Sequence, residues 1–108
     1  KLNEKNSKRD IAYLKEEKYD GIIHLASLFL KDHQSDQVTK LIDSNVRFSS
    51  YILECTSKAG INWFINTGTF WQHYQNGEYS PVNLYAASIL YVPLSIPSIK
   101  PRLLSVFS

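Results

Sequence analysis

The chain has 108 residues, of which 44% are hydrophobic and 20% charged, and its formal net charge at pH 7 is +2. This composition fits one folded domain and argues against intrinsic disorder, and the small basic excess indicates a solvated surface rather than a nucleic-acid partner. The single cysteine, Cys55, excludes an internal disulfide, so we expect a reducing cytoplasm. We expect no signal peptide, because the first residues contain no apolar stretch, and no membrane span, because prolines interrupt the longest apolar run.

The first expected element is a helix that starts near Ser7 and carries a thin apolar stripe. The Ser7 hydroxyl can accept a hydrogen bond from the first turn, and Asp10 favours the positive end of the helix. The Asp-Gly pair at 20–21 then predicts a turn into a strand over residues 22–26. This short apolar run contains β-branched residues and is typical of a parallel strand that is covered on both faces.

A long helix is expected from residue 38 to residue 59, between the predicted N-cap Ser35 and Gly60. Its apolar side chains recur at the i, i+3, i+4, i+7 spacing of one buried helical face. Asn45 and Ser49 fall on the same face, and buried polar groups need hydrogen-bond partners. Either these two side chains bind a neighbouring backbone or they face a ligand.

A second strand over residues 61–66 completes a strand–helix–strand unit. Such a unit pairs its strands in parallel, with a right-handed crossover in nearly all proteins, so the predicted fold class is α/β. Parallel strands end at the same edge of a sheet. Residues 26–27 and 67–69 should therefore emerge side by side, at the edge where open α/β sheets bind ligands.

Residues 70–82 are predicted to form a loop, with a turn at 76–77, ahead of a helix that starts near Asn83. The prolines at positions 93, 97 and 101 should stop this helix early, because each removes a backbone donor. The aromatic residues of the loop are interpreted as a packing lid, with a substrate-facing role as the alternative; they are Trp71, Tyr74 and Tyr79.

The histidines have no metal-like spacing, so no metal site is expected. His24 lies on a predicted strand and is interpreted as a core histidine rather than a ligand. Cys55 lies in a helical pattern without a histidine partner, which favours a small, partly buried apolar side chain over a nucleophile.

Four segments form a pattern in chain order: residues 19–27 (YDGIIHLAS), residues 45–46 (NV), residues 64–69 (FINTGT) and residues 83–88 (NLYAAS). In these segments the chain resembles the NAD-dependent epimerase/dehydratase branch of the extended short-chain dehydrogenase/reductase family. The resemblance implies a partial Rossmann-type parallel sheet, with a strand–helix–strand core and flanking helices. It also implies NAD as the cofactor and, in intact relatives, a nucleotide-sugar substrate.

The resemblance assigns roles to six residues of this sequence. Tyr85 would be the general base that removes a hydroxyl proton as hydride leaves for the nicotinamide, and Thr69 would hydrogen-bond the reacting hydroxyl or carbonyl. In the local alternative, the threonines and the asparagine only bind nearby backbone. The residues implied to lie along the cofactor are Ala26, Ser27, Asn45 and Thr67.

Position 89 departs from the family pattern, which has a lysine four residues after the tyrosine, whereas this chain has Ile89. A free phenol has a pKa of about 10, so roughly one tyrosine in a thousand is ionised at pH 7. A lysine on the same helical face would lower this pKa. Without it, forming the phenolate of Tyr85 costs about 4 kcal/mol, and we expect this chain to be inactive.

The four glycines are too scattered to form the glycine-rich turn that binds a dinucleotide pyrophosphate. We therefore interpret residues 1–88 as a middle slice of an NAD-binding domain and residues 89–108 as a divergent, proline-containing tail that is out of the ancestral reading frame or otherwise replaced. The alternative is a non-catalytic α/β module that binds a nucleotide or a partner through its exposed sheet edge. A third interpretation is a slice that is only marginally folded.

Overall fold

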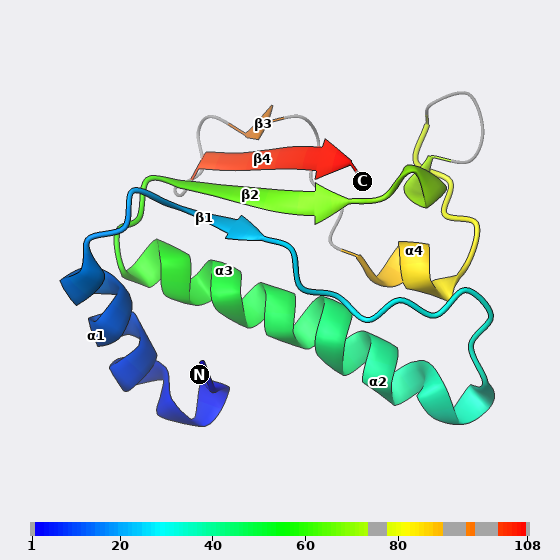
Figure 1. The fold of residues 1–108 in the computed structure, drawn as a ribbon, viewed down its shortest axis with the longest axis horizontal. Coiled ribbons are helices and arrows are strands. Elements are labelled where there is room, and N and C mark those ends of the chain that lie inside the picture. Colours follow the sequence, from blue (N-terminus) through cyan, green and yellow to red (C-terminus); the bar gives the residue numbers. More distant parts are fainter. Residues whose placement is uncertain (1, 74–77, 90–94, 97–101, 108) are drawn as a thin grey trace.

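The fold is a four-stranded sheet with a row of helices along one side (Figure 1). A computed structural model of the chain describes residues 2–73, 78–89, 95–96 and 102–107. The strand order is β1-β2-β4-β3, and the helices α1, α3 and α2 lie on the β1 side of the sheet. The predicted α/β fold class is confirmed.

Within the described residues, three of the four strands are parallel, and β3 pairs antiparallel with β4. The first two strands pair in the register Ile22↔Phe64, which confirms the predicted strand–helix–strand unit. The sequence did not predict β4, which comes from the expected tail and pairs with β2. The strands are β1 (Gly21–His24), β2 (Trp63–Gly68), β3 (Ser95–Ile96) and β4 (Arg102–Phe107).

The strand boundaries differ from the predicted ones by one or two residues at each end, and β2 is shifted toward the C-terminus. The residues before β2 still belong to the helix end, because the Ile61 N–H donates to the Thr56 carbonyl at 3.2 Å. Gly60 makes this reversal with a positive φ of 75°, a conformation that costs glycine little. The apolar run that begins at residue 61 therefore starts before the strand does.

The long predicted helix is confirmed as three consecutive segments, α2 (Val38–Ile42), the π-helical turn η3 (Asp43–Arg47) and α3 (Phe48–Lys58). The π turn was not predicted. Such turns are rare and frequently lie at functional sites. In this chain η3 contains Asn45, which is 1% exposed.

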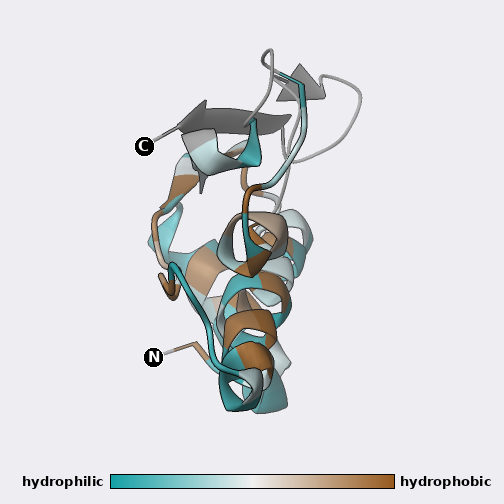
Figure 2. Ribbon diagram, turned by 90° about the vertical axis from the view of Figure 1, so that its right-hand side faces the viewer, coloured by the Kyte–Doolittle hydropathy of each residue, from teal (hydrophilic) through white to brown (hydrophobic). Residues whose placement is uncertain are grey.

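Two buried clusters attach the helices to the sheet. Ile52 of α3 packs with Phe64 of β2, while Cys55 packs with Leu14 and Ile61. Figure 2 shows hydrophobic and hydrophilic stretches alternating along the helices, as expected when each helix buries one face. Fully burying one large apolar side chain stabilises the fold by about 1.5–3 kcal/mol. Cys55 was expected to be partly buried and is fully buried, and burial raises the pKa of its thiol.

The helix start predicted at Ser7 is confirmed, although Ser7 is not the capping residue, and the predicted N-cap Ser35 is wrong. The helix α1 (Ser7–Glu17) is entered through the 3-10 turn η1 (Glu4–Asn6), so Ser7 already lies inside the helical stretch. Ser35 likewise opens the 3-10 turn η2 (Ser35–Gln37), which leads directly into α2. The hydroxyl residues marked the approximate positions but not the extra turn in front of each helix.

None of the helices within the described ranges is long and apolar enough to cross a membrane. Within the same ranges, histidine, cysteine and acidic side chains form no group of three that could hold a metal ion. The expected turn at 76–77, the aromatic Tyr74 and the prolines at 93, 97 and 101 lie outside the residues that the structure describes.

Candidate active site at the carboxyl edge of the sheet

The predicted site residues lie where β1 and β2 end and on the short helix α4 (Leu84–Ser88). The strands run parallel up to the pair His24↔Asn66, so both chains leave the sheet at the same edge. This confirms the predicted common edge. The predicted residues at it are Ala26 and Ser27 after β1, Thr67 in β2, Thr69 after β2, Asn45 in η3 and Tyr85 in α4.

Ala26 and Ser27 are exposed and line a surface hollow of about 410 Å³. The opposite wall comes from the helix, through Asp43, Ser44 and Phe48. This volume falls within the roughly 300–1,000 Å³ of common small-molecule pockets. The two residues expected along the cofactor therefore border an open space next to the helix.

His24 is a core histidine, as predicted. Its Nε2 lies 2.8 Å from the Ser49 hydroxyl, and its ring lies between those of Phe48 and Phe64, with centroid distances of 6.2 and 5.9 Å. Burial lowers the pKa of the imidazole, so the ring is neutral at pH 7. The His24–Ser49 pair thus fixes the end of β1 to α3.

Asn45 binds the segment after β1 through both functional groups of its amide. Its Oδ1 accepts from the Leu28 N–H at 2.7 Å, and its Nδ2 donates to the Leu28 carbonyl at 3.0 Å. Asn45 thus binds a neighbouring backbone, the first of the two roles that the sequence left open. Ser49, one turn later on the same helix, binds the His24 ring instead. The segment carrying Ala26 and Ser27 is held at both ends by this helical face.

Asn45 also reaches α4. Its Nδ2 donates to the Ser88 hydroxyl at 2.9 Å, and this hydroxyl donates to the Tyr85 carbonyl at 2.8 Å. Both Asn45 and Ser88 are buried. One amide therefore joins the helix, the segment after β1 and the turn of α4 that carries Tyr85.

The N-terminus of α4 is fixed by Asn83, as the sequence predicted for a helix starting there. Its Oδ1 accepts from the Ala86 N–H at 2.8 Å, and its Nδ2 donates to the Lys31 carbonyl at 3.1 Å. The helix stops after Ser88, in agreement with the expected early end.

Tyr85 lies in a cluster of three aromatic rings. Its ring meets that of Phe29 edge to face, with centroids 4.9 Å apart, and that of Trp71 at 6.3 Å and 88°. Phe29 and Trp71 also contact each other, at 5.5 Å. Trp71 thus packs, as expected for the loop, and it packs on the candidate base itself. Edge-to-face pairs of this kind contribute about 0.5–1.5 kcal/mol beyond area burial.

Thr69 is buried and connects to the same cluster through Trp71, whose backbone N–H points to the Thr69 hydroxyl at 3.4 Å. The two candidate catalytic residues therefore share a neighbour in the turn η4 (Phe70–Gln72). Thr67 is half-buried in β2 and pairs in register with Val106 of β4.

Gln72 is a site residue that the sequence analysis missed. It is 1% exposed; its Oε1 accepts from the Thr69 N–H at 3.1 Å, and its Nε2 donates to the Ile89 carbonyl at 3.0 Å. A glutamine in an aromatic loop gave no signal, because its partner lies 17 positions away. Ser88 was missed too, although its place beside Tyr85 in the motif was visible.

Ile89 is buried and extended, with φ −74° and ψ 132°, directly after the last helical residue. The position where the family has its lysine is thus apolar and outside α4. Among the described residues, no lysine or arginine is seen in contact with Tyr85 in place of the family's lysine.

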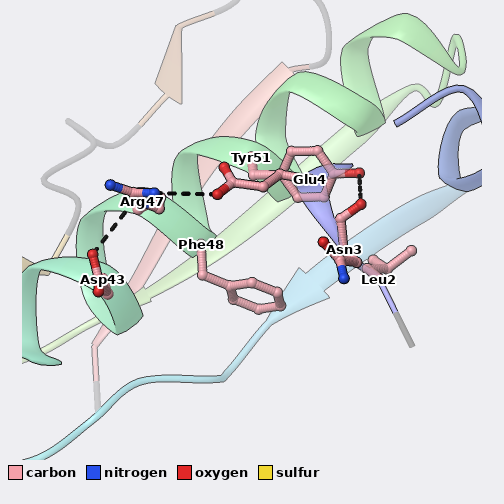
Figure 3. A pocket seen from close by; sticks show the side chains of 7 residues that line it. All are labelled: Leu2, Asn3, Glu4, Asp43, Arg47, Phe48 and Tyr51. Atoms are coloured by element: carbon pink, nitrogen blue, oxygen red, sulfur yellow. Dashed lines mark hydrogen bonds and ion pairs between the residues drawn. The ribbon is translucent and has the colours of Figure 1, made fainter. Parts of the chain in front are cut away.

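A second hollow, of about 210 Å³, lies beside the first and shares Asp43 and Phe48 with it. Figure 3 shows Arg47 between two carboxylates, those of Glu4 at 3.2 Å and Asp43 at 3.4 Å. The guanidinium is therefore already paired, and the hollow presents no spare positive charge for a phosphate. None of the predicted site residues lines this second hollow.

The described residues fit only one wall of a dinucleotide site. Ala26, Ser27 and the adjoining hollow offer an open edge, but a pyrophosphate needs a close backbone approach at a glycine-rich turn. Gly21 serves a different purpose, since a Cβ there would lie 2.0 Å from the Trp63 ring. Gly60 forms the helix end. NAD binding by these residues alone is therefore not supported.

Comparison with known proteins relates the chain to one family. The family model described as "NAD dependent epimerase/dehydratase family" matches residues 2–95. No curated protein matches the chain.

Several solved structures share the fold at low identity. A UDP-Glc/GlcNAc 4-epimerase from Campylobacter jejuni aligns with a TM-score of 0.65 and 21% identity over 77% of this chain. A UDP-glucose-4-epimerase from Stenotrophomonas maltophila, with bound NAD and formylated UDP-arabinopyranose, gives 0.68 and 17% over 81%. A dTDP-glucose 4,6-dehydratase from Streptomyces venezuelae gives 0.64 and 20% over 77%. The matched region is 28% of each of these chains. The likeness confirms the predicted Rossmann-type fold.

Proposed function

Because the chain belongs to the NAD-dependent epimerase/dehydratase family, we propose that it is part of an enzyme that acts by hydride transfer on a nucleotide-linked sugar, and that these 108 residues alone are inactive. The observation that carries the proposal is the placement of Tyr85 and Thr69 against the same residue, Trp71. A phenol and a hydroxyl at the carboxyl edge of a parallel sheet suit proton transfer to and from a sugar hydroxyl.

In this proposal Tyr85 is the general base and Thr69 holds the reacting oxygen. Ala26, Ser27 and Thr67 lie along the cofactor, and Asn45 steadies that edge through Leu28. NAD, when bound, accepts or returns the hydride. The substrate class follows from the relatives, two of which are named as acting on UDP-sugars and one on dTDP-glucose.

Inactivity of the chain as it stands follows from position 89. The phenolate of Tyr85 is about 4 kcal/mol uphill at pH 7 without a nearby cation. Ile89 is buried, extended and uncharged, so it supplies none. We also propose that residues 1–88 carry the ancestral domain and that residues 89–108 are a divergent tail. In this proposal the strand β4 of the tail was added to the free side of β2. We further propose that the chain is cytoplasmic.

The proposal is tested by following formation of an epimerised or dehydrated sugar nucleotide from UDP-glucose or dTDP-glucose in the presence of NAD, because the hydride returns to the sugar and leaves no net reduced NAD. The chain alone should form none. A version in which residues 1–88 replace the matching region of a full-length relative, such as the dTDP-glucose 4,6-dehydratase, so that the relative supplies the glycine-rich strand and the segment with the lysine of the family pattern, should form it. Tyr85→Phe in that version should abolish the reaction because the base is removed. Turnover by the chain alone, or turnover that survives Tyr85→Phe, would contradict the proposal.

One observation favours the second candidate, a non-catalytic module that binds a partner through its sheet edge. β1 is the end strand of the sheet, and Ile23 is 58% exposed and Leu25 70% exposed. Parallel sheets are normally covered on both faces, and open edges pair readily with other strands. If this candidate is correct, Ile23→Lys should abolish partner capture while leaving cofactor titrations of the version completed by the relative unchanged.

A further inference from the structure

The helix that carries Tyr85 cannot fix its own position. α4 spans only Leu84–Ser88, and isolated helices shorter than about 12 residues are marginal in water. Its placement must therefore come from contacts with the rest of the chain. Three amide side chains supply hydrogen bonds around it, and they are Asn83 at its own N-cap, Asn45 in η3 and Gln72 in η4.

Each amide connects α4 to a different part of the site. Asn83 ties the start of the helix to Lys31, and Asn45 ties its last turn to Leu28. Gln72 alone ties its end to the segment after β2, where Thr69 lies.

We infer that Gln72 is a positioning residue that sets Tyr85 against Thr69. This inference rests on the proposed function, in which Tyr85 is the base and Thr69 holds the reacting oxygen, so that their relative position matters. Both ends of the buried amide are used: the Oε1 holds the Thr69 N–H and the Nε2 holds the Ile89 carbonyl.

The backbone of Gln72 is fixed as well, so the side chain acts from a rigid base. Its N–H donates to the Thr69 carbonyl at 3.0 Å, and its carbonyl accepts from the Ser80 N–H at 2.6 Å. The backbone of Ile89 is extended and directly follows the last helical residue, so α4 has no N–H group that could bond to the Ile89 carbonyl. The Gln72 amide supplies the missing bond at the point where the helix ends.

The requirement is specific for an amide, because one group must donate and the other must accept. An ionised carboxylate at this position accepts from the Thr69 N–H but cannot donate to the Ile89 carbonyl. A protonated carboxyl group can do both. Burial raises the pKa of a carboxyl group, so a glutamate introduced here should change between these forms above its usual value of about 4.3.

The test is Gln72→Glu, followed by NMR as the pH is lowered. The readout is the cross-peak between the Tyr85 and Trp71 rings, whose centroids lie 6.3 Å apart in the structure. We expect the cross-peak to be lost at pH 8, where the introduced carboxyl is ionised, and to return at low pH, where it is protonated. The amide signal of Thr69 should shift along the same titration curve.

Two comparisons keep the result interpretable. Gln34→Glu makes the same charge change at an exposed position and should leave the ring cross-peak unchanged at every pH. Gln72→Met removes both hydrogen bonds and should lose the cross-peak at every pH. The ring contact between His24 and Phe64, at 5.9 Å in the core, should persist in all three variants.

Three outcomes would overturn the inference. In the first, the Tyr85–Trp71 contact is unchanged in Gln72→Met. In the second, it is lost in Gln72→Glu without recovering at low pH. In the third, the His24–Phe64 contact disappears together with it, which would make Gln72 a general core residue. None of these readouts needs cofactor or substrate, so a failure here is distinguishable from a failure of the proposed function.

Discussion

Asp10 is a buried carboxylate held by two hydrogen bonds from other elements. The Tyr51 hydroxyl donates to its Oδ2, and the Asn3 N–H donates to the same oxygen at 2.8 Å. The hydrogen bond from Tyr51, followed by that from Asn3, holds the pKa of Asp10 below its ordinary value. Burial, with the hydrogen bond to Asp10, raises the pKa of Tyr51. The pair thus fixes the N-terminal segment to α1 and α3 with the carboxyl charged and the phenol neutral.

This arrangement predicts a loss of stability in acid. A carboxyl group whose pKa is lowered in the folded state contributes stability above its unfolded value, about 3.9, and loses it as the pH falls through the lower folded value. Asp10→Asn should therefore flatten the decline of the urea midpoint below about pH 4. The matched control, Asp36→Asn at an exposed position, should keep the decline of the original chain. An unchanged decline in Asp10→Asn would show that other carboxyl groups cause it.

Several individual residues could be predicted from the sequence, and others could not. His24 and Asn45 were identified because a polar side chain on an apolar strand or helical face must find a partner. Gln72 was not identified, since its two partners are backbone groups whose positions depend on the path of a loop. Sequence spacing reveals which side chains share a face, but not where a distant carbonyl lies.

At the level of elements, α4 should be the most sensitive to its cap. Asn83→Ala removes both the bond to the Ala86 N–H and the bond to the Lys31 carbonyl. Losing such a cap costs about 0.5–2 kcal/mol. In Asn83→Ala, the backbone amides of residues 84–88 should exchange faster than in the original chain, while exchange in α3 should not change. Asn6→Ala is the matched control, because Asn6 occupies the cap position of α1 without a side-chain cap bond, and exchange in α1 should not change. Equal effects of the two variants would contradict this account.

The elements themselves were largely predictable, while their ends were not. The long helix followed from one apolar stripe, but Val38 and Ile42 of that stripe are exposed in the structure, and the stripe did not indicate the π turn η3. β4 was missed for a physical reason as well, since its partner strand β2 lies more than thirty positions earlier and the intervening prolines indicated only an end to helix.

For the whole molecule, the decisive feature is that the described residues form only part of a binding site at the carboxyl edge of the sheet. The described residues supply the parallel strand ends, the aromatic cluster with Tyr85 and an open hollow next to Ala26 and Ser27. They contain no glycine-rich turn to hold a pyrophosphate. The chain also spans only 28% of the structures that it resembles. The fold and the family could be predicted from short motifs. A complete site also needs groups that these motifs do not contain, such as the glycine-rich turn.

The most direct test of this account is a calorimetric titration of the chain with NAD. The chain as it stands should give no saturable heat, because one wall of the site is missing. A version extended upstream by a glycine-rich strand that can pair with β1 should bind NAD measurably. Saturable binding by the chain alone, or no gain on extension, would contradict the central claim that these residues form one part of a dinucleotide-dependent site.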